Sequence, residues 1–134
     1  LLGVIYDLVE DLSYLSNVSY KHVNNNHSRL KKTQIQDLNE IYESLSSLFK
    51  EGIEAFSLEF SEKEFKDVLE QKSENFELLN SKIDAQILRT QSETSPKTTA
   101  LYFNILIRTK DLILHKYNLV EEFFQVTKDV KSTS

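Results

Sequence analysis

Five polar residues lie at alternating spacings of four and three in the most apolar stretch of the sequence, residues 99–128. They are Asn104, Arg108, Asp111, His115 and Asn118. At about 100° per residue, this spacing places all five on one line along a helix, which we call the polar stripe. A buried polar group without a partner costs about 1–3 kcal/mol. We therefore expect the polar stripe to find partners or to face a cleft.

A second group of acids lies near the start of the chain. Asp7 and Asp11 are four residues apart, as are Asp111 and His115, so each pair projects from one side of a helix. If the two helices pack side by side, the four side chains can converge as metal ligands. Oxygen ligands with one imidazole suit a divalent metal such as Fe, Zn, Mn or Mg. Such spacings are common on helices, so salt bridges with Arg108 are the favoured alternative, and no cofactor is certain.

The sequence contains no set of residues that indicates an enzyme. It has no cysteine, no serine framed by glycines and no glycine-rich phosphate loop. A ferritin-like di-iron site needs Glu-x-x-His motifs, and none of the three histidines has a glutamate three residues before it. His22 and His27 are interpreted as solvated loop residues rather than metal ligands, and His115 as a hydrogen-bonded core histidine rather than a base.

Composition predicts the elements that must position these residues. The 134 residues include only two glycines and one proline, and 40% of them are hydrophobic. Long helices exclude glycine and proline, whereas turns and strands use them heavily. The net charge of −5 gives no basic face for nucleic acid. No apolar run approaches the roughly 18 residues of a membrane span. We therefore expect an all-α protein that binds no nucleic acid.

Hydrophobic periodicity and capping signals predict four long helices. The first spans residues 1–20, with an apolar arc that includes Leu12, and a polar loop follows over 21–32. The second begins at Thr33, which can form a capping box with Gln36, and the third spans 61–90, where Ser61 and Glu64 form another. The charges of the third helix, Lys82 among them, are predicted to be a solvated face.

The fourth helix contains the polar stripe. Ser95 is suited to its N-cap and Pro96 to its first position, and we expect it to end near residue 128. Short links between long helices imply antiparallel neighbours. The fold class is therefore an antiparallel up-and-down bundle of about four helices in a single domain, 1–134. The chain opens on Leu1 within an amphipathic pattern, so we expect it to be excised from a longer protein.

Two of these helices resemble the PhoU family, whose signature is Glu-Arg-Ile-Gly-Asp-His-Ala-x-Asn. Residues 7–11 match its acid-x-x-x-Asp part, and on the last helix Asp111 matches the aspartate while His115 stands where asparagine is usual. Segments 22–27, 101–106 and 109–115 are similar to the PhoU-like domain at the C-terminus of bacterial sodium/phosphate cotransporter-family proteins. The sequence departs from the signature at Ile107, in place of the glutamate, and at Leu15, in place of the asparagine.

The resemblance implies a cytoplasmic regulatory domain of a bacterial inner-membrane, sodium-dependent phosphate transporter. Its partner would be the membrane-embedded part of the same transporter, contacted through the helical bundle in the control of phosphate uptake. Some members of the family hold iron or another divalent metal on the acidic motifs, but the departures at Ile107 and Leu15 disfavour a full metal cluster. The alternative hypothesis is a self-associating helical bundle, such as a homodimer, with a structural role and no ligand.

Overall fold

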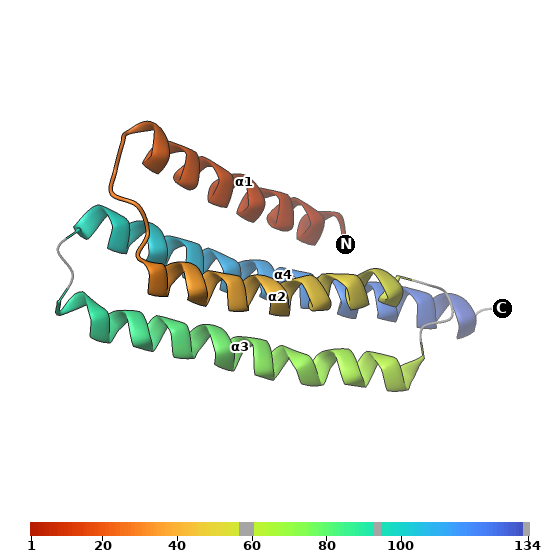
Figure 1. Ribbon diagram of the computed structural model, residues 1–134. Helices are drawn as coiled ribbons and strands as arrows, with labels where there is room; N and C mark the ends of the chain where they lie inside the picture. The colour runs from red at the N-terminus through yellow and green to blue at the C-terminus, as the bar shows by residue number, and fades with distance from the viewer. Residues whose placement is uncertain (57–60, 93–94, 133–134) are drawn as a thin grey trace.

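The computed structural model describes residues 1–56, 61–92 and 95–132, and these form four α-helices. They are α1 (Leu2–Asn24), α2 (Lys32–Ala55), α3 (Glu62–Thr90) and α4 (Pro96–Ser132). Successive helices run in opposite directions (Figure 1), and the described residues contain no strand. The predicted all-α bundle is therefore confirmed. None of the helices, within these ranges, is both long and apolar enough to cross a bilayer.

The central element is α4, which packs against each of the other three helices. A helix that is apolar nearly all round is expected to be buried in this way. Tyr102, Ile113 and Val120 of this helix are all buried. Together with Leu106 and Tyr117 they form the centre of the core, which α2 and α3 complete.

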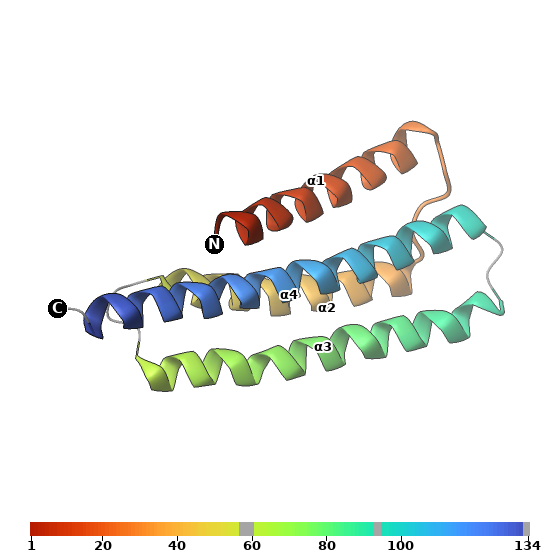
Figure 2. The same cartoon turned by 180° about the vertical axis from the view of Figure 1, so that it is seen from behind.

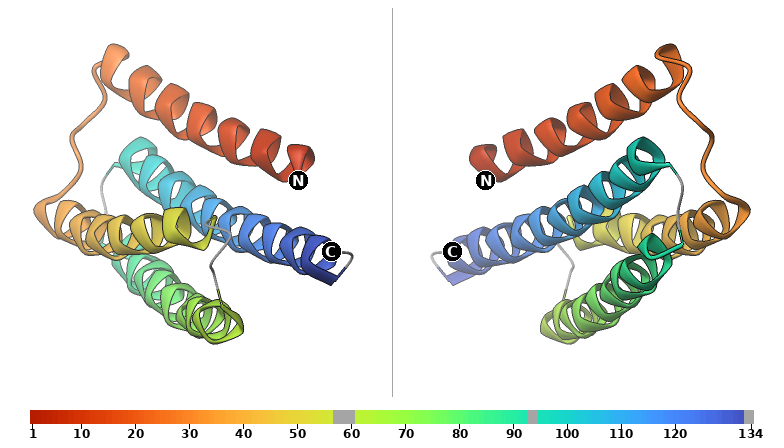
Figure 3. Two further views of the ribbon diagram at one scale, coloured as in Figure 1. Left: turned by 90° about the vertical axis from the view of Figure 1, so that its right-hand side faces the viewer. Right: turned by 90° about the vertical axis from the view of Figure 1, so that its left-hand side faces the viewer.

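The first helix lies apart from the rest of the bundle. Helices α2, α3 and α4 form a three-helix group, and α1 lies along α4 on its outer side (Figures 2 and 3). Among the described residues α1 packs against α4 alone. Val4, Leu8 and Leu15 of the predicted apolar arc are partly buried there, but Leu12 is 55% exposed. The bundle is therefore open on the side of α1 that faces away from α4.

The first helix ends four residues later than predicted, because it stops only where an asparagine adopts a left-handed conformation. Asn26 has φ of 53°, which asparagine tolerates better than most residues. Its N–H donates to the carbonyl of Val23 (3.0 Å), and the N–H of His27 donates to the carbonyl of His22 (3.2 Å). These two bonds define a Schellman motif, which satisfies carbonyl groups at a helix C-terminus.

The start of α2 is capped differently from the prediction. The helix begins at Lys32, so Thr33 is already helical and does not serve as its N-cap. Instead, the side-chain oxygen of Gln34 accepts a hydrogen bond from the backbone N–H of Lys31 (2.8 Å). The predicted capping box of Thr33 and Gln36 is therefore replaced by a cap shifted two residues earlier.

The starts of α3 and α4 follow the prediction. The Ser61 hydroxyl accepts a hydrogen bond from the N–H of Glu64 (3.3 Å), and the Glu64 carboxylate accepts one from the N–H of Ser61 (2.8 Å). Pro96 is the first residue of α4 and follows Ser95. The fourth helix continues to Ser132, past the predicted end, while residues 133–134 lie outside the described part of the chain.

Candidate functional site

A buried carboxylate, Asp11, lies between α1 and α4. Its side chain is only 2% exposed. The guanidinium of Arg108 donates to one carboxylate oxygen (3.0 Å), and Nδ1 of His115 lies 2.8 Å from the other. The side-by-side packing of the first and last helices therefore brings Asp11 together with two residues of the polar stripe.

The guanidinium of Arg108 has three neighbours. Besides Asp11, it lies 3.8 Å from the carboxylate of Asp111, three residues along the same helix. Its planar face lies over the ring of Tyr14, 4.3 Å from the ring centroid, a geometry in which a cation is attracted to the aromatic π-system. The hydrogen bond to Asp11, followed by the nearby negative charges, raises the pKa of Arg108. Arg108 therefore stays charged under ordinary conditions.

Three other predicted residues lie outside this ion pair. Asp7 is one turn earlier on α1 and is partly exposed, as is Asn118, whereas Asn104 is exposed. The two carboxylate oxygens of Asp11 are bonded to Arg108 and His115 and not to any of these three. The polar stripe does face α1 at its centre, but its ends are solvated.

The four predicted metal ligands do not assemble into a metal centre. Across residues 1–56, 61–92 and 95–132, no three His, Cys, Asp or Glu side chains are placed to hold one ion. The physical reason lies in Arg108, whose cation contacts both Asp11 and Asp111. A divalent metal bound to these carboxylates would have to displace the guanidinium, because two cations so close together repel each other. The geometry thus favours the salt-bridge alternative.

The contact between Asp11 and His115 also limits what chemistry the site can perform. A carboxylate oxygen only accepts, so Nδ1 of His115 carries the proton that it donates to Asp11. This arrangement orients an imidazole as it does in general-base dyads. The other partner of Asp11 is the cation of Arg108, and the group contains no nucleophile that His115 could activate. We therefore interpret this group as a polar clamp between α1 and α4.

A second buried carboxylate, Asp37, was missed by the sequence analysis. It joins all three helices of the inner group. Arg89 donates to one of its oxygens (2.8 Å) and the Tyr102 hydroxyl donates to the same oxygen (2.9 Å). The ammonium of Lys82 lies 3.1 Å from the other oxygen. Lys82, predicted to be part of a solvated face, is instead 16% exposed and also pairs with Glu40.

Electrostatics explain why Asp37 stays charged. Burial alone would raise its pKa, but the hydrogen bonds from Arg89, Lys82 and Tyr102 outweigh burial and hold the pKa below its ordinary value. Burial, followed by the bond to Asp37, raises the pKa of Tyr102 far above that of a free phenol. The phenol therefore remains a neutral hydrogen-bond donor.

Two buried glutamines extend this network toward the start of α2. The amide of Gln34 donates to the side-chain oxygen of Gln86 (3.4 Å), and both side chains are fully buried. The sequence signal for the network was a helical spacing of polar residues on core faces. Gln34, Asp37 and Ile41 on α2 are spaced by three and then four residues, and on α3 the residues at 82, 86 and 89 are spaced by four and then three.

No family model, curated protein or solved structure matches this chain. The all-α bundle is established by the structure itself. The similarity of residues 7–11 and 109–115 to PhoU-like domains stays a prediction.

Proposed function

We propose that this domain is a protein-interaction module that associates with a second copy of itself through the outer face of α1. One observation carries the proposal. The side of α1 that faces away from α4 presents a line of apolar side chains at heptad spacing. We call this line the outer seam, and it consists of Leu2, Ile5, Val9, Leu12, Ser16 and Val23.

Exposure and spacing both support a helical occupant. The five apolar residues of the outer seam are 41–83% exposed, although most surface helices keep such residues turned toward the core. From Leu2 to Ser16 the spacings alternate between three and four, as in a seam between two packed helices, and Val23 follows one heptad later. Because α1 packs only against α4 within the described residues, no other helix of the same chain covers this seam.

Charge supports a second copy as the occupant. The six residues of the outer seam include no charged side chain, so this face is neutral within a chain of net charge −5. Two copies of a neutral apolar face can meet without the repulsion that their remaining surfaces would produce. A two-fold axis would place the same seam on both sides of the interface.

The test is the oligomeric state over a concentration series, measured by sedimentation velocity. We expect the wild-type chain to dimerise and Leu12→Glu to weaken the dimer by about 100-fold or more. That variant removes, at two symmetric positions, a leucine that the dimer would bury, and burying a leucine is worth about 1.5–3 kcal/mol. The matched control is Leu88→Glu, an exposed leucine on α3, which should leave the dimer intact. A wild-type chain that stays monomeric throughout would overturn the proposal.

A second candidate is the regulatory role in a sodium-dependent phosphate transporter that the PhoU resemblance implies. The observation that favours it is the clamp itself, since Asp11 and Asp111 lie beside the Arg108 guanidinium and His115 contacts Asp11 between α1 and α4. In this role the outer seam would contact a helix of the membrane-embedded part. A photo-crosslinking side chain at Val9 of the full-length protein distinguishes the two. Crosslinks to the membrane-embedded part support regulation, and crosslinks only to a second copy oppose it.

A further inference from the structure

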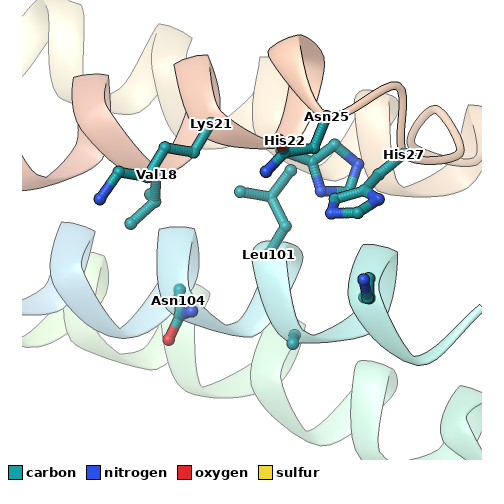
Figure 4. Close-up of a pocket in the computed structure, with 9 residues that line it drawn as sticks. Val18, Lys21, His22, Asn25, His27, Leu101 and Asn104 are labelled. Carbon is teal, nitrogen blue, oxygen red and sulfur yellow. The ribbon is translucent and has the colours of Figure 1, made fainter.

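A small pocket lies at the end of the molecule where α1 finishes and α4 begins. Its volume is about 250 Å³. Figure 4 shows the rings of His22 and His27 side by side near the end of α1, with Leu101 rising from α4 toward α1. The pocket is lined by Val18, Lys21, His22, Asn25, His27, Lys97, Ala100, Leu101 and Asn104.

The residues that line this pocket include basic side chains but no acidic one. The nine residues combine two lysines, two imidazoles and two carboxamides. The whole chain, in contrast, has a net charge of −5. A concave site lined by charges of one sign concentrates the field within it. The pocket therefore attracts an anion and repels a metal cation, even though two histidines face it.

The Schellman motif at the end of α1 holds the two imidazoles in place. His22 and His27 are the two residues that this motif joins by a backbone hydrogen bond, and their ring centroids are 5.1 Å apart in an edge-to-face arrangement. The ring of His22 is fixed further, because Nε2 donates to the carbonyl of Ser28 (2.8 Å). A ligand would therefore meet imidazole rings that are already positioned, and positioned groups need little reordering on binding.

The surroundings of His27 disfavour its protonated form. Desolvation, followed by the charges of Lys97 and His22, lowers the pKa of His27. An anion bound beside these groups would act in the opposite direction and favour the protonated imidazole.

We propose that this pocket binds a small oxyanion of the phosphate class. Lysine and imidazole are point donors that surround a tetrahedral anion, whereas planar carboxylates are matched best by the fork of an arginine, which the lining lacks. Val18, Ala100 and Leu101 form an apolar wall beside the donors. This wall suits an anion that carries a short carbon skeleton, such as a phosphate monoester. The proposal is independent of dimerisation through the outer seam.

The three histidines of the chain make a direct test by NMR possible. The imidazole resonances are titrated against pH in inorganic phosphate and in sodium chloride of equal ionic strength. We expect phosphate to move the titration midpoint of His27 upward by about one pH unit, as a nearby opposite charge does. His115 lies in the clamp, away from the pocket lining, and serves as the internal control that should not move. An unchanged His27 midpoint would overturn the proposal.

Variants and further probes complete the test. We expect Lys97→Gln to weaken phosphate binding about tenfold, as the loss of one charged hydrogen bond does. Lys63→Gln, at an exposed lysine in the first turn of α3, should have no effect. The start of α3 lies at the opposite end of the bundle from the end of α1 (Figure 1). Tighter binding of glycerol 3-phosphate than of inorganic phosphate would support a phosphate monoester. Binding only to phosphatidylglycerol vesicles, and to neither soluble phosphate, would overturn the pocket and indicate a membrane surface.

Discussion

Replacing Arg108 should destabilise the domain more than replacing Asp11, although the two form one ion pair. The reason is that their burial differs. The Asp11 side chain is 2% exposed, whereas that of Arg108 is 33% exposed. If Asp11 is replaced, the partly exposed guanidinium of Arg108 can be hydrated instead. If Arg108 is replaced, the buried carboxylate of Asp11 cannot be hydrated.

The magnitudes follow from this asymmetry. Arg108→Met keeps the aliphatic stem but leaves the carboxylate of Asp11 buried. Breaking a buried pair in this way costs about 3–5 kcal/mol, and we expect about 3 because His115 still donates to Asp11. Asp11→Asn keeps the shape of the side chain and removes the buried charge. Its effect is the loss of charge-assisted hydrogen bonds, about 1–2 kcal/mol once the exposed partners are hydrated.

The assay is urea unfolding at neutral pH, followed by far-ultraviolet circular dichroism, for both single variants and the double variant. The double variant should lose about 1–2 kcal/mol less than the sum of the two, since it buries no unpaired charge and the residues are in contact. Asp111→Asn is the control. Its carboxylate is 44% exposed, and we expect a change of about 0.5 kcal/mol or less. Equal losses for Arg108→Met and Asp11→Asn, or strictly additive losses, would refute the reasoning.

Two further predictions concern the other buried carboxylate and the end of α1. The folded state lowers the pKa of Asp37 below its ordinary value of 3.8. Its contribution to stability is therefore complete above that value and is lost as the pH falls through the lowered pKa. Urea unfolding over an acid pH series should show the gap between wild type and Asp37→Asn shrinking in that range, and a constant gap would contradict this. At Asn26, Gly should be tolerated because φ is 53°, whereas Ala should cost about 1 kcal/mol. Thermal unfolding of this matched pair checks the cap, and equal melting temperatures would argue against it.

The pairing of Asp11 with α4 was predictable because a polar residue stood inside an apolar arc on each of two helices. Asp11 interrupts the inner face of α1, and Arg108 and His115 interrupt the apolar face of α4. A buried carboxylate on α1 needs a polar partner, and the polar residues of α4 need one as well, so the two helices were expected to pair through them. Helical spacing was sufficient to place these residues on facing lines, while the choice between metal and salt bridge needed the position of the guanidinium.

The Asp37 network was not predicted, because helical spacing shows which residues share a face but not which faces meet. Lys82 and Arg89 look like ordinary charges on an outer helix until α2 places a carboxylate beside them. The orientation of α1 was ambiguous for a related reason. Its sequence has apolar residues on two sides, with Leu8 and Leu15 on one and Val9 and Leu12 on the other. Both sides satisfy a helical period, and only packing distinguishes them.

The placement of α1 also has a consequence for how the chain is made. The helix packs only against α4 among the described residues, and the Arg108 partner of Asp11 lies 97 positions further along the chain. During synthesis at about 5–20 residues per second, α1 emerges first and must wait roughly 5–20 seconds for its only neighbour. Both of its apolar faces are uncovered in that interval. The inner face can be covered only once α4 leaves the ribosome, so α1 cannot dock before the fourth helix has been synthesised.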